Sequence, residues 1–470
     1  MAAEAVGRTV PRGHAELSPG RAWVALAALL TGTFLGTINN NIVNVPLRDI
    51  TVDLGVPVSA GVLVVVAFSL TFAVLMPVMG WLGDRIGRRR MFCAALAGIA
   101  GGALGAALAP DLRILVAFRV VQGAATAALL PTVMGIIAAL FGPDRRGRAV
   151  GMWAAVNGLG QAIGPPVGGL VSQLVGWRWM FVPIVPLALA ALALTLRLVP
   201  RDTGRPNRLD WPGATTLTVG AALLILAVTV LGQPGTPAVL TAALTVAGVV
   251  VLAVFVLVSR RVANPFIPLR LVAESVYLRS CLAVFAQMFC LGAALLAVPL
   301  HLTEGVGATS TATAGLIVFA LPAAMTVLAP VAGVCTERYG ARRAIRAGLV
   351  AVAVAQAVLA VELATGHGRG LDLVAALVLT GAGVAFVQTP AATGVTRSPA
   401  GRAGTGLGLF NLVRFAGAAV GAAWVAIALE HSGGFGVLFA ACAVVAVAGL
   451  VGTFVGPTPT SLARPVNRPG

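Results

Sequence analysis

Residues 80–90 read GWLGDRIGRRR, and residues 333–343 repeat the same pattern as GVCTERYGARR. Both copies contain a glycine, three variable residues, an acid, Arg, a bulky residue, Gly, one variable residue and Arg-Arg, and the second begins 253 residues after the first. Each copy follows one apolar segment and precedes another. A charged hairpin repeated half a chain away indicates two duplicated halves. In a membrane protein this organisation is typical of a transporter built from two helical bundles.

The composition is that of a membrane protein. Of the 470 residues, 59% are hydrophobic and 10% are charged, whereas a soluble domain has about 25% charged residues. Apolar runs such as 62–79, 239–258 and 437–455 have the length of about 20 residues that crosses a bilayer as a helix. The sequence therefore predicts an all-α polytopic membrane protein. The net charge of +17 comes from arginines dispersed between the runs, so a nucleic-acid partner is not expected.

The arginines indicate which ends of the helices face the cytoplasm. We expect about fourteen spans, and with the N-terminus inside, 26 of the 32 basic residues fall in interior loops. Arg119 and Arg414 lie within spans. The other four are in exterior loops: Arg48, Arg113, Arg178 and Arg369. Because cytoplasmic loops carry the excess of arginine, we expect a multi-pass protein of the cell membrane with both termini in the cytoplasm.

A second repeat supports the duplication. Gly147-Arg148-Ala149 and Gly401-Arg402-Ala403 lie 254 residues apart, and an asparagine, Asn157 or Asn411, follows each arginine by nine residues. Two anchors at nearly one offset predict two six-helix bundles as parallel repeats, with two extra central helices. The predicted parts are a cytoplasmic tail (1–20), a first bundle (21–200), a linker with the extra helices (201–263), a second bundle (264–457) and a cytoplasmic tail (458–470).

Several motifs resemble those of the major facilitator superfamily, and within it the fourteen-helix drug:proton antiporter branch. Residues 80–90 resemble the loop between its second and third helices, residues 119–123 (RVVQG) its fourth-helix motif, and residues 42–45 (IVNV) the first-helix motif of the branch. Residues 158–169 (GLGQAIGPPVGG) resemble the fifth-helix motif that marks exporters. The resemblance implies a monomeric multidrug efflux antiporter. It would export lipophilic or amphipathic small molecules by alternating access in exchange for protons.

The sequence leaves other functions open. A lipid or nutrient carrier of the same fold would have the same spans, and a non-transporting membrane sensor or scaffold is a third possibility. An enzyme is not expected, since no clustered nucleophile, metal set or acid pair appears. The five cysteines are scattered and mostly lie within apolar spans, so neither a metal site nor a cofactor is expected.

The doubled hairpin is predicted to gate transport. An acid at a fixed place can pair with a neighbouring Arg or with a helix N-terminus of the same half and so latch one conformation. The alternative is a cytoplasmic anchor that needs only the arginines. Gly83 and Arg88 of the first copy become Thr336 and Ala341 in the second, so the first copy is the better candidate latch and the second a reduced partner. The predicted gating residues are Gly80, Gly83, Asp84, Arg85, Gly87, Arg88, Arg89, Glu337 and Arg338.

Two arginines are predicted inside the membrane. Arg119, with Gln122 one turn along the same face, is a candidate proton relay or substrate-facing charge. The alternative is a structural hub that caps backbone carbonyls of neighbouring helices. Arg414 is the second such residue, and no family motif covers it.

Small residues and prolines mark the span that contains residues 158–169. Small residues would allow close approach and the prolines a bend: Gly158, Gly160, Gly164, Pro165, Pro166, Gly168 and Gly169. They predict a helix at the interface between the two halves. Ordinary packing of neighbouring helices is the alternative.

The central cavity is predicted to be largely apolar, with a few neutral polar groups. Asn39 stands where the antiporter branch usually carries an Asp, so Asp49 and His301 are the candidates for the titrating group. Met76, Phe285, Met288 and Phe386 are apolar candidates for its wall. The polar candidates are Asn39, Asn41, Asn44, Asn157, Gln161, Gln287, Gln388 and Asn411; helix–helix hydrogen bonding is their alternative role.

Overall fold

The computed structural model describes residues 19–204, 208–231, 236–303, 311–365, 370–431 and 434–454, and these ranges contain helices and no strand. The predicted tails lie outside the described residues, apart from residues 19 and 20, and so does Arg369.

Within the described ranges, fourteen long helical segments follow one another, and two short helices connect some of them. The first group is α1 (Pro19–Asn41), the short α2 (Leu47–Asp53), α3 (Val58–Ile86), α4 (Arg88–Ala107), α5 (Leu112–Leu140), α6 (Pro143–Val175) and α7 (Ile184–Leu198), the last continuing a 3₁₀ turn at Trp177–Met180. Next come α8 (Trp211–Leu231), α9 (Ala238–Arg261) and the short α10 (Leu269–Val272). The last group is α11 (Ser275–Thr303), α12 (Thr311–Tyr339), α13 (Ala341–Thr365), α14 (Leu371–Arg397), α15 (Gly404–His431) and α16 (Phe435–Gly452), with a 3₁₀ turn at Ala400–Arg402 before α15.

Most of these helices have the length and composition of membrane spans. Thirteen within the described ranges are long and apolar enough to cross a membrane. Helix α6 has 33 residues and is the fourteenth, but its glycines, prolines and amides make it more polar than the others. The expectation of an all-α polytopic protein is confirmed.

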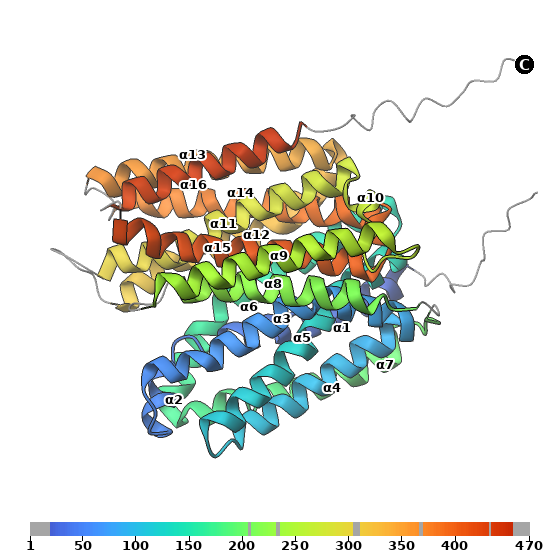
Figure 1. The fold of residues 1–470 in the computed structure, drawn as a ribbon, viewed down its shortest axis with the longest axis horizontal. Helices are drawn as coiled ribbons and strands as arrows, with labels where there is room; N and C mark the ends of the chain where they lie inside the picture. The colour runs from blue at the N-terminus through green and yellow to red at the C-terminus, as the bar shows by residue number, and fades with distance from the viewer. Residues whose placement is uncertain are drawn as a thin grey trace, which may run out of the picture.

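The helices form two groups that meet along a seam (Figure 1). Helices α1 and α3–α7 lie in the lower part of the view and α11–α16 in the upper part. Across the seam, α3 packs against α15 and α6 packs against α12. Helix α8 contacts both α3 and α15, so the α8–α9 pair covers one side of the seam.

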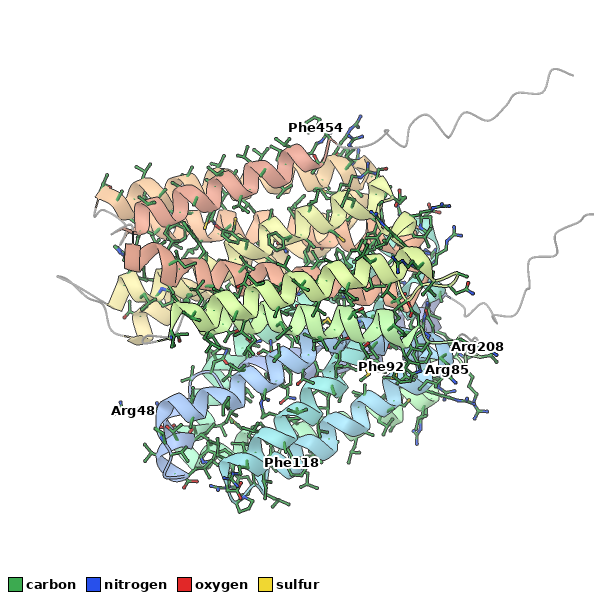
Figure 2. The ribbon with its side chains drawn as sticks, in the orientation of Figure 1. Arg48, Arg85, Phe92, Phe118, Arg208 and Phe454 are labelled. Atoms are coloured by element: carbon green, nitrogen blue, oxygen red, sulfur yellow. The ribbon has the colours of Figure 1, made fainter. Side chains whose placement is uncertain are left out.

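The two ends of the bundle differ in the residues they carry. Figure 2 shows Arg85 and Arg208 at one end, with Phe454 at the same end of the upper group, and Arg48 at the opposite end. The repeated hairpins and Arg208 were predicted to share one side of the membrane and Arg48 to lie on the other. The labelled residues lie at the ends of the bundle that this prediction gives them, and the side of the membrane that each end faces stays a prediction.

The repeated hairpins turn on a single glycine. Gly87 connects α3 to α4 with φ +100°, and Gly340 connects α12 to α13 with φ +87°. A side chain is strained in this left-handed region, which explains why both copies keep glycine at this position of the motif.

Candidate functional site

The carboxylate of Asp84 joins the two halves at the arginine-rich end. Its Oδ1 lies 3.0 Å from Nη2 of Arg88, and its Oδ2 accepts the backbone N–H of Gly404. Gly404 is the first residue of α15, so the carboxylate occupies the positive end of that helix. We call Asp84, Arg88 and Gly404 the first latch.

The first latch confirms one prediction and corrects another. Asp84 does pair with a neighbouring arginine. The helix N-terminus that it meets belongs to the other half of the chain, so the expectation of a contact within one half was wrong. Arg88 extends the link, because its guanidinium also donates to the carbonyl of Arg402 at 3.1 Å and to that of Gly135 at 2.8 Å.

Two glycines bring the backbones of α3 and α15 into contact beside this latch. A Cβ placed on Gly80 would lie 2.0 Å from the carbonyl oxygen of Gly404, and a Cβ on Gly404 would lie 2.0 Å from that of Gly80. No side chain fits at such distances. The first glycine of the motif is therefore required by a contact between the halves.

The second copy of the hairpin forms its own link. Oε1 of Glu337 accepts the backbone N–H of Arg148 at 2.8 Å, and Oε2 accepts Nε of the same residue at 3.0 Å. Here too glycines face each other, since a Cβ on Gly333 would lie 2.6 Å from the carbonyl oxygen of Gly147. We call Glu337, Arg148 and these two glycines the second latch. The second latch has these two hydrogen bonds, both to one residue, and no counterpart of Arg88, so the prediction that it is a reduced partner stays a prediction.

The first hairpin is also tied to the linker after α7. Oδ2 of Asp202 accepts the N–H of Arg88 at 2.6 Å, and Oδ1 accepts that of Arg89 at 3.0 Å. These are the first two residues of α4, so a linker acid caps the helix. Asp202 was not among the predicted residues, because nothing in its local sequence shows which helix end it reaches.

The other predicted gating residues are not part of either latch. A Cβ on Gly83 would meet Oγ1 of Thr132 at 3.3 Å. The guanidinium of Arg85 stacks 5.1 Å from the ring of Trp81. Arg338 lies 5.4 Å from the ring of its neighbour Tyr339.

Arg119 is fully buried and holds three helices together. Its Nε donates to the carbonyl of Val64 in α3 at 3.1 Å, and its Nη1 donates to the carbonyl of Asn39 in α1 at 3.0 Å. Nη1 also reaches Oε1 of Gln122 at 3.0 Å and Oδ1 of Asn39 at 3.4 Å. The guanidinium lies 4.2 Å above the ring of Phe68. These contacts are those of the structural alternative, a hub that caps carbonyls.

Arg414 is equally buried and has fewer partners. Its Nη2 donates to Oδ1 of Asn157 at 2.8 Å, which joins α15 to α6 across the seam. Its Nε and Nη1 have no hydrogen-bond partner among the described residues. The rings of Trp153 and Phe415 lie 5.5 and 5.0 Å from the guanidinium carbon.

Helix α6 lies at the seam, against α12, but only Gly158 of the predicted glycines faces the other half. A Cβ on Gly160 would meet Thr37 at 2.8 Å, and one on Gly168 would meet the carbonyl of Ile42 at 1.9 Å. Gly164 likewise meets Asn41, so these three glycines pack against α1 in their own half. Their placement between the halves was wrong, and the packing alternative holds for them. Pro165 lies within the unbroken helix.

The glycines of α6 that do face the other half lie on a different stripe. A Cβ on Gly151 would lie 2.7 Å from the carbonyl oxygen of Ala329, and one on Gly158 would lie 2.4 Å from Met325. Gly147 belongs to the same stripe, and all three approach α12.

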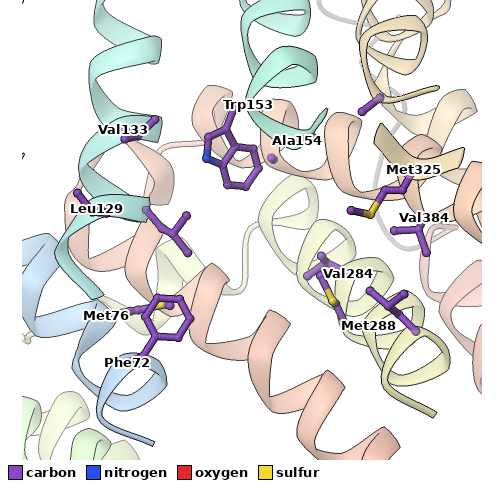
Figure 3. Close-up of a cluster of buried hydrophobic side chains, with 14 of the residues drawn as sticks. Phe72, Met76, Leu129, Val133, Trp153, Ala154, Val284, Met288, Met325 and Val384 are labelled. Carbon is purple, nitrogen blue, oxygen red and sulfur yellow. The ribbon is translucent and has the colours of Figure 1, made fainter. Parts of the chain in front are cut away.

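A cavity of about 190 Å³ lies between the halves, toward the middle of the helices. Helices α1, α3, α5 and α6 form one wall and α11 and α15 the other. Figure 3 shows buried apolar side chains that both halves contribute to the seam. The rings of Phe72 and Phe415 meet edge to face across it, with centroids 4.6 Å apart. The lining of the cavity is Thr33, Gly36, Thr37, Asn40, Asn41, Phe72, Thr126, Leu129, Leu130, Asn157, Gln161, Met288, Leu291, Gly292, Leu295, Phe415 and Ala418.

Some of the residues that were predicted to line the central cavity do line it. Asn41, Asn157, Gln161 and Met288 do so, and none of the lining residues is charged. Asn40, adjacent to two predicted candidates, was missed. The remaining candidates lie elsewhere: Asn39, Asn44, Met76, Phe285, Gln287, Phe386, Gln388 and Asn411.

Several of these candidates do not line the cavity because their side chains point in another direction. Asn39 points to Arg119, and Asn44 is exposed beyond the end of α1. Asn411 donates back to the carbonyl of Leu407 at 2.9 Å within its own helix. Gln287 and Gln388 are buried, and neither amide has a hydrogen-bond partner among the described residues.

The two candidate titrating groups also lie away from the cavity wall. Oδ2 of Asp49 in α2 accepts the hydroxyl of Ser172 in α6 at 2.6 Å. The ring of His301 packs edge-on against Phe435 with centroids 4.9 Å apart.

Close by in α2, Asp53 accepts hydrogen bonds from Arg178 and from Nε1 of Trp177. These two donors hold the pKa of the Asp53 carboxyl below its usual range. The connection after α6 is thereby fixed to α2.

Comparison with known proteins agrees with this architecture. The family model described as Major Facilitator Superfamily matches residues 29–264 and 280–470. The chain is 33% identical over 409 residues to the puromycin resistance protein pur8 of Streptomyces alboniger, covering 86% of this chain and 81% of that protein. It is 31% identical over 418 residues to the multidrug resistance protein Stp of Mycobacterium tuberculosis, covering 87% and 77%. The fold is similar to that of the human organic anion transporter MFSD10, with a TM-score of 0.66 at 17% identity over 93% of this chain and 100% of that one.

Proposed function

The chain belongs to the Major Facilitator Superfamily and is a membrane transporter rather than an enzyme, and on that basis we propose that it exports lipophilic or amphipathic small molecules from the cytoplasm. The proposed cycle is alternating access, in which a central site opens to one side of the membrane and then to the other. We take residues 21–200 and 264–457 as the two moving bodies and a monomer as the working unit.

The observation that carries this proposal is a cavity between the halves that two latches close at one end. Asp84 caps α15 and Glu337 holds Arg148, so each half supplies an acid to the other. Both hairpins are arginine-rich, and the excess of arginine supports a cytoplasmic position for them and for both termini. The conformation is then the one closed toward the cytoplasm, and opening both latches would admit cargo from inside.

The cavity wall supports a lipophilic cargo. Its lining combines leucines and aromatic rings with a few neutral amides and hydroxyls, and none of the lining residues is charged. Such a wall suits molecules with a large apolar surface. The relatives named for puromycin resistance and multidrug resistance support export as the direction.

We further propose that proton entry drives export. The branch's usual first-helix acid is replaced by Asn39, so the titrating group lies elsewhere. Asp49 and His301 are the candidates, and both lie toward the end of the bundle opposite the latches.

Drug accumulation in cells that lack their own efflux pumps tests the proposal. Expression should lower the accumulation of several chemically varied lipophilic compounds, and a protonophore should restore it. If accumulation is unchanged by expression for every compound, the exporter function is wrong. If export persists after the proton gradient is collapsed, only the coupling to protons is wrong.

A further inference from the structure

Among the described residues, the guanidinium of Arg414 is a buried cation without an anionic partner. Its side chain is fully buried in α15, and its one hydrogen bond runs from Nη2 to the neutral amide oxygen of Asn157. The Nε and Nη1 donors have no acceptor among the described residues. Burying a charge is costly unless hydrogen bonds and an opposite charge compensate it. Arg414 therefore has capacity to bind an anion.

Arg119 is the better compensated arginine of the same bundle. It is as fully buried and its Nη2 has no partner among the described residues, but two backbone carbonyls and two side-chain amide oxygens accept from its Nε and Nη1. Its contacts all lie within one half. Arg414 has a single acceptor, and that acceptor lies across the seam. The difference indicates that Arg414 is not simply another structural hub.

Arg414 lies directly behind the cavity wall. Asn157, which accepts its hydrogen bond, lines the cavity, and so does Phe415, whose ring lies 5.0 Å from the guanidinium carbon. Oδ1 of Asn157 is shared, because Nε2 of Gln161 also donates to it at 2.8 Å. If Asn157 turns away, Gln161 can keep its bond to that amide while Nη2 of Arg414 becomes open to the cavity.

We propose that Arg414 recognises an anionic oxygen group on the exported molecule, with a carboxylate on an apolar body as the preferred class. The inference rests on the proposed function and names its substrate. A carboxylate takes the place of the Asn157 oxygen and accepts two N–H groups from the planar guanidinium. The apolar part of the molecule lies against Phe72, Leu129 and Leu295. A lipophilic ammonium ion is repelled by the same guanidinium.

Three derivatives of one fluorophore separate these possibilities: 1-naphthaleneacetate, 1-naphthaleneacetamide and 2-(1-naphthyl)ethylamine. Their binding to the purified protein and their export from proteoliposomes are measured side by side at pH 7. The wild-type protein should bind the carboxylate about tenfold more tightly than the amide, the factor that one charge-assisted hydrogen bond supplies. The amine should bind more weakly than the amide.

Variants then assign the preference to Arg414. The Arg414→Gln protein should lose the preference for the carboxylate while it still binds the amide, and this remaining binding shows that the variant is folded. The Arg414→Lys protein should keep part of the preference. Arg145→Gln is the matched control, because it removes the same charge from an exposed position and should leave the order of affinities as it is.

The two proposals fail in different ways. Equal or weaker binding of the carboxylate by the wild-type protein overturns the role of Arg414, and so does an Arg414→Gln variant with the preference intact. If the Arg414→Gln protein does not fold, the role of Arg414 is decided by the order of the three affinities in the wild-type protein and in the Arg414→Lys protein. Absence of export for all three compounds counts against the proposed function, whereas the binding order still decides the anion site.

Discussion

The carboxylate of Asp84 in α3 accepts the backbone N–H of Gly404, the first residue of α15 and a member of the other half of the molecule. The second half returns the contact through Glu337 and the backbone N–H of Arg148. One duplicated motif thus links the halves twice at the same end. Each link consists of a few hydrogen bonds next to a tight glycine contact. The two halves can therefore stay together at this end and still separate when the hydrogen bonds break.

The negative charge of Asp84 should contribute more to the export rate than the shape of its side chain. In Asp84→Asn, an amide oxygen can still accept from Gly404, but the ion pair with Arg88 and the negative charge at the α15 N-terminus are lost. We expect the export rate to fall roughly tenfold, as for the loss of one charged hydrogen bond. Initial export rates from proteoliposomes check this. Normal amounts of protein in the membrane with an unimpaired rate would falsify the latch.

Gly80→Ala should prevent the cytoplasmic end from closing. Its Cβ would lie 2.0 Å from the Gly404 carbonyl oxygen, so α3 and α15 must separate. Gly101→Ala is the matched control, since nothing lies within 4 Å of a Cβ there. We expect export to be lost in the first variant and retained in the second, with both proteins folded. A cysteine placed near Arg402 should be labelled faster by a water-soluble maleimide in Gly80→Ala; equal labelling in both variants would argue against the tight contact.

In the second latch, the two partners should contribute unequally. Arg148→Gln removes an ion pair whose arginine side chain is 57% exposed, and such a pair is worth about 0–1 kcal/mol. Glu337→Gln also replaces the charged acceptor of the Arg148 backbone N–H at 2.8 Å. Slower export in Glu337→Gln than in Arg148→Gln is therefore expected in parallel rate measurements. Equal rates would mean that the ion pair alone forms this latch.

The features that could be predicted from the sequence are those that depend on residues close together in the sequence. The apolar runs, the arginine bias and the glycines at the hairpins follow from local composition, and the long apolar helices and the turns at Gly87 and Gly340 agree with them. The sequence did not predict which side of a helix packs against which neighbouring helix. Gly158 and Gly160 are two residues apart, about 200° around the helix, so the first faces α12 and the second α1.

The same limit applies to the polar residues. Asn39 and Asn40 are adjacent, yet only Asn40 lines the cavity, while Asn39 lies beside Arg119. The partners of Asp84 and Asp202 depend on how distant segments pack, which no local pattern records. Candidate residue types were therefore predictable, but their partners across the seam were not.

Asn39→Asp should stabilise the first half. Oδ1 of Asn39 already lies 3.4 Å from Nη1 of Arg119, whose partners are all neutral, so a carboxylate here would give the buried guanidinium a counter-charge. We expect the free energy of unfolding to rise by about 1 kcal/mol or more. Thermal unfolding of the purified protein measures the change. Asn44→Asp adds the same charge at an exposed position after α1 and should leave the midpoint unchanged. A lower midpoint in Asn39→Asp would show that desolvation of the new carboxylate exceeds its attraction to Arg119, so that the neutral hub around Arg119 is already the more stable arrangement.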